Sequence, residues 1–146
     1  MVISYNLSHV FYPGADKVMN AQTLREMIEM LVRVNLVYLT RAKAFGHTVP
    51  SLYRSGVTYR RAGFWEPIPT LYGRRWGDCK SLASALIAEQ RFQGIYSQPA
   101  TRFLENEDGE IDYHILVQLG TEFEDPSYKL GMGKDEVAKF YGTGSY

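Results

Sequence analysis

The segment that decides the expected fold of this chain is Arg74-Arg75-Trp76-Gly77-Asp78-Cys79-Lys80-Ser81-Leu82-Ala83-Ser84-Ala85-Leu86-Ile87-Ala88. Gly77 gives the backbone freedom for a tight turn, and Asp78 is a residue type that caps helix N-termini. Apolar residues then recur at helical spacing. The pattern predicts a turn followed by a helix whose first turn contains Cys79.

The first turn of a helix is an activating position for a thiol. Free amide donors and the positive end of the helix dipole stabilise a thiolate, and Arg74, Arg75 and Lys80 add positive charge nearby in sequence. Taken alone, Cys79 is better explained as a small core residue, because free cysteine is among the most buried residue types. Its role therefore depends on residues further along the chain.

Composition indicates one domain over residues 1–146, with an extended arm at 1–18 and a C-terminal tail at 134–146. The chain has 16 basic and 16 acidic residues, so no bulk charge favours nucleic acid or a membrane surface as a partner. The charges are distributed unevenly. Residues 1–104 carry thirteen bases and six acids, whereas 105–125 carry eight acids and no base. We expect these two parts to pair within one fold.

The single cysteine excludes an internal disulfide and a multi-cysteine metal cluster, and we predict no metal and no cofactor. Zinc ligation by Cys79, His114 and Asp125 is a weak alternative, because no short-spaced ligand pair supports it. The sequence has no apolar run of the roughly 18 residues that span a bilayer, and its N-terminus lacks the features of a secretory signal. We expect a protein kept in a cytoplasm or carried in a particle assembled there.

A long N-terminal helix is predicted from a capping box at Thr23 and Glu26 to a stop at Gly46. Residues 50–70 are rich in loop signals, and Pro67-Ile68-Pro69 is expected to block regular structure. Shorter patterns predict a strand near 56–59, the end of the cysteine helix near 92–93, strand pieces at 95–96 and 101–104, and a short helix at 134–141.

The clearest strand pattern covers residues 111–119, where apolar residues at odd positions alternate with residues such as His114. If Leu119-Gly120 forms a two-residue loop, the chain returns at 121–125 and Asp125 lies opposite His114 on one face. Taken separately, His114 is better explained as a surface histidine and Asp125 as a turn residue. Together with Cys79, they supply the thiolate, imidazole and orienting acid that nucleophilic catalysis needs.

Three segments resemble the signature segments of the transglutaminase-like superfamily of cysteine proteases and acyl transferases. The chain is particularly similar to its short members encoded by bacteriophages and prophages, over roughly residues 50–133. In those proteins a Tyr-Arg-Arg-rich segment precedes the cysteine turn, and Leu-Gly-Met follows Asp-Pro-Ser. The matching residues here are 57–61, Trp76-Gly77-Asp78-Cys79-Lys80-Ser81-Leu82-Ala83, Asp112-Tyr113-His114-Ile115-Leu116-Val117, Glu124-Asp125-Pro126-Ser127 and Leu130-Gly131-Met132.

The resemblance implies an α+β fold with a papain-like transglutaminase core, in which the cysteine-bearing helix packs on a small antiparallel sheet. The long N-terminal helix lies outside the matching motifs. By position, Cys79 would be the nucleophile, His114 the general acid and base, and Asp125 the orienting acid. The Cys79 N–H would form part of the oxyanion hole, and Trp65 and Trp76 are candidates for a second donor. Relatives often carry acids after the cysteine, where this chain has Lys80 and Ser81.

The expected function is cysteine-dependent acyl transfer on a protein or peptide amide. The short chain leaves little room for added substrate domains, which favours hydrolysis over crosslinking. The alternative is a phage virion or assembly protein that uses the fold for protein binding through its arm and tail. The expected partners are a protein or peptide substrate and phage structural proteins, with no nucleic acid and no membrane span. The expected location is the bacterial cytoplasm or the virion.

Overall fold

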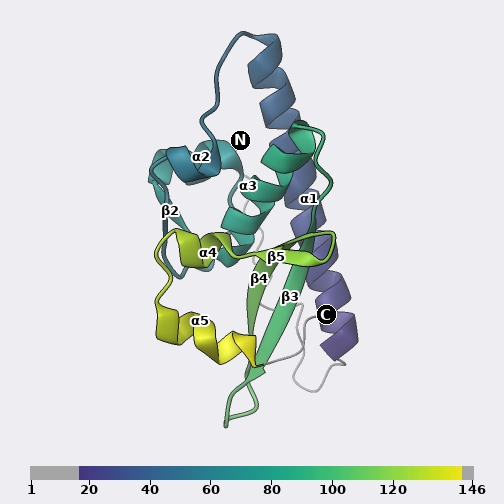
Figure 1. Ribbon diagram of the computed structural model, residues 1–146, viewed down its shortest axis with the longest axis vertical. Coiled ribbons are helices and arrows are strands. Elements are labelled where there is room, and N and C mark those ends of the chain that lie inside the picture. Colours follow the sequence, from purple (N-terminus) through teal and green to yellow (C-terminus); the bar gives the residue numbers. More distant parts are fainter. Residues whose placement is uncertain (1–16, 143–146) are drawn as a thin grey trace.

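The fold is that of a computed structural model, which describes residues 17–142. The predicted arm at 1–18 lies outside this range except for its last two residues, which belong to a helix. The described chain is α+β (Figure 1). Its elements in order are α1 (Lys17–Ala44), the 3₁₀ turn η1 (Leu52–Arg54), β1 (Thr58–Tyr59), α2 (Ile68–Arg74), β2 (Trp76–Gly77), α3 (Cys79–Phe92), β3 (Gln98–Glu105), β4 (Ile111–Leu119), β5 (Glu122–Glu124), α4 (Pro126–Lys129) and α5 (Lys134–Tyr141).

The strands form two separate sheets. β3, β4 and β5 make an antiparallel sheet in sequence order, with β4 in the middle. β1 and β2 form a short parallel pair that precedes the N-terminus of α3. The cysteine turn is therefore held by hydrogen bonds to a second segment of chain, including Arg60 N–H to the Gly77 carbonyl at 2.8 Å.

Helix α3 lies at the centre of the main hydrophobic core and contacts both α1 and β4 (Figure 1). Every residue from Cys79 to Ala88 is buried. Small residues are interspersed among large ones in this stretch, so the helix can be covered on all sides. Its apolar residues pack with Ile115 and Val117 of β4 and with Ile28 and Val32 of α1.

Two helix predictions need correction. α1 begins at Lys17, and Thr23 is inside it, where its hydroxyl donates to the Met19 carbonyl instead of capping the helix. The region around Pro69 is not blocked, since α2 starts at Ile68. Proline lacks an N–H, but the first turn of a helix has no acceptor for that group, so Pro69 is tolerated there.

The β4–β5 hairpin forms, but its register differs from the prediction by two residues along β5. Val117 pairs with Glu124 and Leu119 with Glu122, so the loop lies one residue later than expected. Continuing this pairing places Asp125 opposite Leu116 and diagonal to His114. A shift of two residues keeps each side chain on its original face, whereas a shift of one would reverse it. Asp125 therefore still lies on the face that carries His114.

The basic segment at 1–104 and the acidic segment at 105–125 pair only in part. Arg61 forms an ion pair with Asp112, as the uneven charge distribution predicts. Glu124 instead pairs with Lys129, which lies beyond the acidic segment.

The chain after β5 contacts two parts of the fold, because α4 packs on α3 and α5 packs on β3. α4 and α5 follow each other closely, and α5 occupies Lys134–Tyr141 as the sequence predicted. Met132, Val137 and Phe140 form a second hydrophobic cluster, separate from the main core. We call this cluster of three residues the satellite cluster.

Candidate functional site

Cys79 occupies the first position of α3, and Asp78 is the N-cap residue. The Asp78 carboxylate accepts a hydrogen bond from the Ser81 N–H at 3.5 Å. Gly77 is required for a steric reason, because a Cβ atom at this position would collide with the Leu71 side chain. The helix start at Cys79 is confirmed. The turn is made at Arg75, which has a positive φ of 68°, whereas Gly77 lies in β2, so close packing and not backbone freedom explains this glycine.

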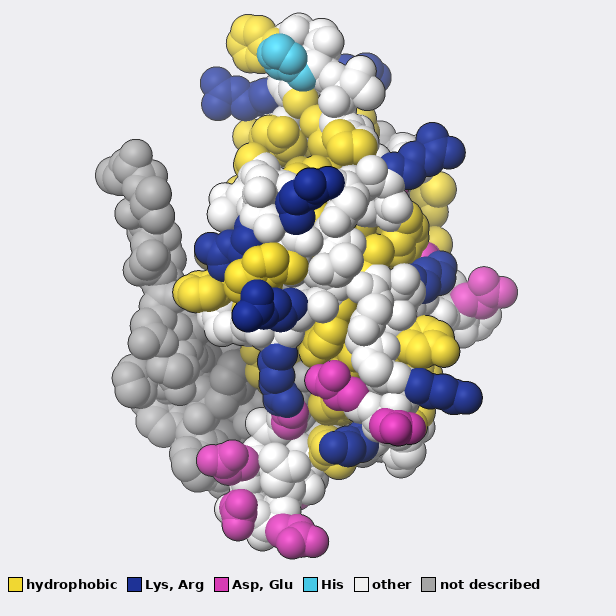
Figure 2. Space-filling view, turned by 90° about the vertical axis from the view of Figure 1, so that its left-hand side faces the viewer, with side chains coloured by type: hydrophobic (Ala, Val, Ile, Leu, Met, Phe, Trp, Pro, Cys, Tyr) yellow, Lys and Arg dark blue, Asp and Glu magenta, His cyan; other side chains and the backbone are white. Residues whose placement is uncertain are grey.

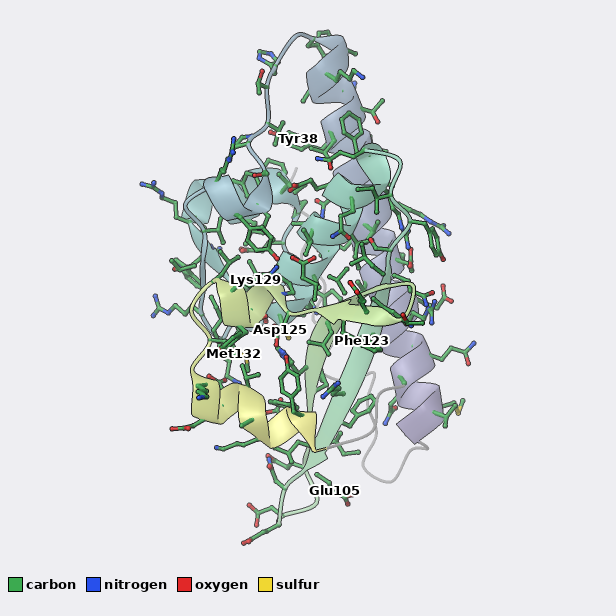
Figure 3. All side chains as sticks on the ribbon, viewed as in Figure 1. Tyr38, Glu105, Phe123, Asp125, Lys129 and Met132 are labelled. Atoms are coloured by element: carbon green, nitrogen blue, oxygen red, sulfur yellow. The ribbon has the colours of Figure 1, made fainter. Side chains whose placement is uncertain are left out.

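His114 and Asp125 form a buried hydrogen-bonded pair. His114 Nε2 lies 2.9 Å from Asp125 Oδ2, and the two residues are 1% and 7% exposed. Asp125 lies where β5 passes into α4 (Figure 3). Burial raises the pKa of the Asp125 carboxyl, but hydrogen bonds from His114, the Tyr128 N–H and the Tyr141 hydroxyl outweigh it and lower the pKa overall. Asp125 is consequently an anion that can orient the imidazole.

The second ring nitrogen of His114 is available for chemistry. Nδ1 is buried and has no hydrogen-bond partner among the residues that the structure describes. A buried ring nitrogen without a partner is costly, so such an atom marks a place where another group binds or reacts. His114 and Cys79 line the same pocket, which brings the two residues to one site.

This pocket, which we call the Cys79 pocket, has a volume of about 120 Å³. α5 covers part of it, and the Phe140 ring lies 5.3 Å from the His114 ring between centroids. Cys79 itself is only 8% exposed. The pocket is lined by Tyr59, Arg61, Ala62, Asp78, Cys79, Lys80, Asp112, Tyr113, His114, Met132, Glu136 and Phe140.

The predicted lowering of the Cys79 thiol pKa is wrong, because the thiol is buried. Burial raises the pKa of the Cys79 thiol to about 12, and the Asp78 carboxylate adds to the rise. Lys80 and a hydrogen bond from the Ile115 N–H act in the opposite direction but are weaker. The thiol is therefore protonated at neutral pH, and its reaction requires a base.

Two of the three basic residues near Cys79 in sequence, Arg74 and Lys80, are paired with other groups. Arg74 forms an ion pair with Glu66 at 2.9 Å. Lys80 is buried, where it pairs with Asp78 and donates to the Ala62 carbonyl at 3.0 Å. The positive charges of Arg74 and Lys80 are thus neutralised in the fold.

Neither tryptophan proposed as an oxyanion donor lines the Cys79 pocket. Trp76 is stacked with Arg60 and Arg74, whose guanidinium carbons lie 4.7 and 4.9 Å from its ring. Lys80 Nζ lies 5.6 Å from the Trp65 ring. The pocket gives no support to an oxyanion role for either residue. The Cys79 N–H fits that role better, because the first amide of a helix has no acceptor within the helix.

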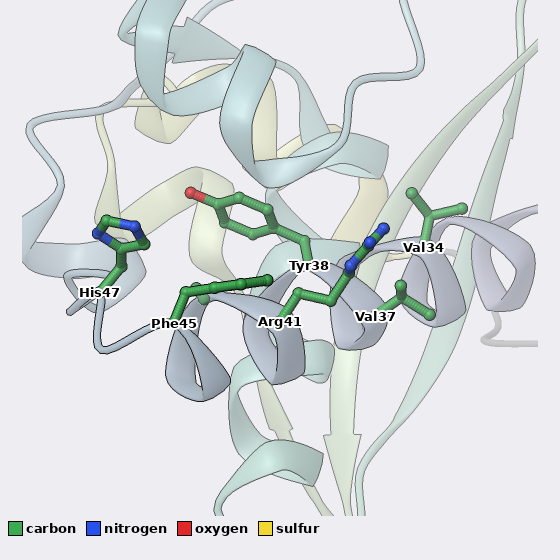
Figure 4. Close-up of a pocket in the computed structure, with 7 residues that line it drawn as sticks. Val34, Val37, Tyr38, Arg41, Phe45 and His47 are labelled. Carbon is green, nitrogen blue, oxygen red and sulfur yellow. The ribbon is translucent and has the colours of Figure 1, made fainter.

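A larger pocket of about 400 Å³ lies elsewhere, along the C-terminal part of α1 and the connector that follows it (Figure 4). Its lining is mainly apolar and contains no thiol. We place the candidate active site at the smaller pocket, because that pocket contains Cys79 and His114. The larger pocket is lined by Val34, Val37, Tyr38, Arg41, Ala42, Phe45 and His47.

Comparisons with protein-family models, curated proteins and solved structures found no match for this chain. Within residues 17–142, no group of three or more histidine, cysteine or acidic side chains is arranged to hold a metal ion. No helix in the described part of the chain is long and apolar enough to cross a bilayer.

The sequence interpretation missed the contribution of α5 to this site. Glu136 and Phe140 line the pocket, and the Tyr141 hydroxyl donates to Asp125 Oδ2 at 3.1 Å. The helix itself was predicted, but its spacing gives no signal for what it packs against. The three residues lie at positions i, i+4 and i+5 of a helix, which becomes informative only once that helix is known to pack on β3 with Phe140 beside His114.

Proposed function

We propose that this protein performs cysteine-dependent acyl transfer on a protein or peptide amide, and that hydrolysis predominates. One observation carries the proposal: His114 lines the pocket of Cys79 and is bonded through Nε2 to a buried carboxylate, while its Nδ1 is unpartnered within the described chain. A nucleophile, a base and an acid that orients the base are thereby combined. We also propose a papain-like transglutaminase core, supported by α3 packed on β4 with Asp125 directly after the neighbouring strand.

The acylation step follows from the protonated thiol. His114 Nδ1 takes the Cys79 proton as Sγ attacks the carbonyl carbon of the amide, and Asp125 stabilises the imidazolium that forms. The negative charge on the tetrahedral oxygen is stabilised by the Cys79 N–H at the positive end of α3. His114 then donates the proton to the leaving amine, the C–N bond breaks, and a thioester remains on Cys79.

The thioester is resolved by the same base. His114 removes a proton from water as its oxygen attacks the thioester carbonyl, and the Cys79 sulfur leaves and is reprotonated. The products are a carboxylic acid and the free enzyme. A primary amine in place of water would give a new amide instead.

The test uses para-nitrophenyl acetate as a generic acyl donor and mass spectrometry of the intact chain. We expect para-nitrophenolate release and an acetyl group on Cys79, both absent in Cys79→Ala. His114→Ala should slow acetylation by about a hundredfold or more, the usual contribution of a positioned base. Circular dichroism must show that both variants fold.

Adding butylamine separates the two outcomes for the acyl group. Acetate as the main product supports hydrolysis, whereas N-butylacetamide indicates transfer. A folded wild-type protein that never acquires the acetyl group contradicts the proposal and favours the protein-binding alternative.

A further inference from the structure

The Cys79 pocket carries an excess of negative charge. Two cations line it, Arg61 and Lys80, together with three carboxylates, Asp78, Asp112 and Glu136. Because Lys80 is 3% exposed and paired with Asp78, this pair presents no net charge to a substrate. The basic residue that follows the cysteine in sequence therefore does not make the pocket positive.

The other cation is also matched. Arg61 pairs with Asp112, and the Arg61 side chain is 68% exposed, so this pair lies at the solvent-facing edge of the pocket. Glu136 is the carboxylate that remains. Within the described residues it has no ion-pair partner, and its hydrogen bond comes from the Tyr59 hydroxyl at 3.2 Å. The space-filling view in Figure 2 shows acidic side chains gathered toward the lower end of that face. Basic side chains lie mainly over its middle and upper parts.

A second observation indicates that a ligand belongs here. His114, 1% exposed, lines the pocket with an unpartnered Nδ1, so the site is incomplete among the described residues. Glu136 lines the same pocket as Cys79, so a ligand bound there lies near its carboxylate. Opposite charge favours the ligand that carries a cation.

We propose that the Cys79 pocket binds a lysine or arginine side chain of the substrate near the amide that is attacked, with Glu136 as the partner of the cation. This inference rests on the proposed function and specifies its substrate class. A bound cation would have a second effect, because positive charge beside the thiol favours its deprotonation. Asp78 and Asp112 both raise the pKa of Cys79 in the unliganded protein, so a cationic substrate would offset part of that field.

The test needs no identified substrate, because Cys79 is the single cysteine of the chain. Three methanethiosulfonates are compared: aminoethyl, which is cationic, sulfonatoethyl, which is anionic, and methyl, which is neutral and smaller. In each reaction Sγ forms a disulfide bond with the reagent sulfur and methanesulfinate leaves. Intact mass gives the rate. We expect the aminoethyl reagent to react faster than the sulfonatoethyl reagent by about tenfold or more at low salt.

Three variants locate the cause of this ratio. Glu136→Gln should reduce the cation-to-anion ratio by about tenfold, and Arg61→Gln should increase it. Glu122→Gln is the matched control, because Glu122 is an exposed acid outside the pocket and its removal changes the net charge equally. We expect the control ratio to stay within about twofold of wild type, since distant surface charges are screened.

A ratio of one or less in wild type would overturn the inference, as would a ratio that Glu136→Gln and Glu122→Gln reduce equally. The proposed function is judged separately, by the methyl reagent and its dependence on His114. Slow methyl labelling that ignores His114 contradicts the function while leaving the charge ratio measurable. Because every variant is compared with itself across reagents, a change in general access to Cys79 cancels from the ratio.

Discussion

Cys79 and Asp125 contribute to one candidate site but are held in place by different means. Cys79 begins a helix whose first ten residues are all buried in the main core. Asp125 precedes a four-residue helix and is held by donors from three directions: His114, the Tyr128 N–H and the Tyr141 hydroxyl. Apolar packing of a whole helix therefore adds to the hydrogen bonds that position the nucleophile, whereas the acid depends mainly on hydrogen bonds.

Access to the site depends on α5, whose Tyr141 also holds Asp125. The satellite cluster of Met132, Val137 and Phe140 attaches α5 over His114. It is much smaller than the main core, which joins α1, α2, α3 and β4. Elements with few buried apolar contacts open at lower cost than the core does. The site should therefore open on the α5 side while the nucleophile stays in place.

The largest expected effect comes from a cavity in the main core. Leu82 is fully buried in α3, so Leu82→Ala should lower the free energy of unfolding by about 2–5 kcal/mol. Urea denaturation followed by circular dichroism measures this loss. Labelling of Cys79 by methyl methanethiosulfonate should change little in Leu82→Ala at concentrations where the variant remains folded.

Phe140→Ala should show the reverse pattern. It removes the ring beside His114, so Cys79 labelling should accelerate by roughly tenfold, while the satellite cluster loses fewer contacts than the core does in Leu82→Ala. If Leu82→Ala accelerates labelling of the folded protein as much as Phe140→Ala does, the main core and the α5 side do not differ in how they control access to Cys79.

Features that depend on the local sequence could be predicted, whereas features that depend on distant segments could not. The helix start at Cys79, the strand around His114 and the helix at Lys134–Tyr141 were predicted because capping, alternation and helical spacing are local properties. α2 was missed, since Pro69 was taken as a helix breaker and its place in the first turn depends on where the helix begins. The β5 register was shifted because the position of the two-residue loop cannot be fixed from Gly120 alone.

The thiol pKa could not be predicted for a different reason. The dipole of α3 is visible in the sequence, but burial of Cys79 depends on segments that approach from elsewhere, such as Tyr113 and Phe140. Burial outweighs the favourable position in the helix. The roles of Cys79, His114 and Asp125 in catalysis remain predictions, although the structure brings these residues to one site.

A smaller effect is expected from the titration of Cys79. Its pKa is raised to about 12 in the folded protein, against about 8.5 for an unfolded thiol. The folded chain thus holds the proton more tightly, so this contribution to stability is complete below about pH 8.5 and is lost as the pH rises toward 12. Between about pH 8.5 and 9.5, the free energy of unfolding should fall by about 1 kcal/mol more in wild type than in Cys79→Ser.

Urea denaturation at several pH values measures this difference. Cys79→Ser is the appropriate reference, because serine is close to cysteine in size and does not titrate in this range. Parallel stability curves for the two proteins would show that the thiol is not held protonated by burial. Burial of Cys79 in the main core would then have no effect on its titration.

The smallest effect tests the hydrogen bonds around Asp125. Tyr141→Phe removes the hydroxyl that donates to Oδ2, the same oxygen that contacts His114. We expect acetylation of Cys79 to slow by roughly threefold, the size of one partly exposed hydrogen bond. Without this donor the pKa of Asp125 should rise, so the acid limb of the pH–rate profile should move to higher pH.

The matched control is Tyr128→Phe. Tyr128 is as exposed as Tyr141, at 49%, but it bonds Asp125 through its backbone N–H, which the substitution leaves in place. A shift of the acid limb in Tyr141→Phe alone would identify Tyr141 as a positioning residue that acts through Asp125. Equal profiles in both variants would mean that the remaining donors hold Asp125 unaided, and α5 would then contribute to the site through Phe140 and Glu136 only. The pH profile decides this, because loss of packing alone would slow the reaction without moving the limb.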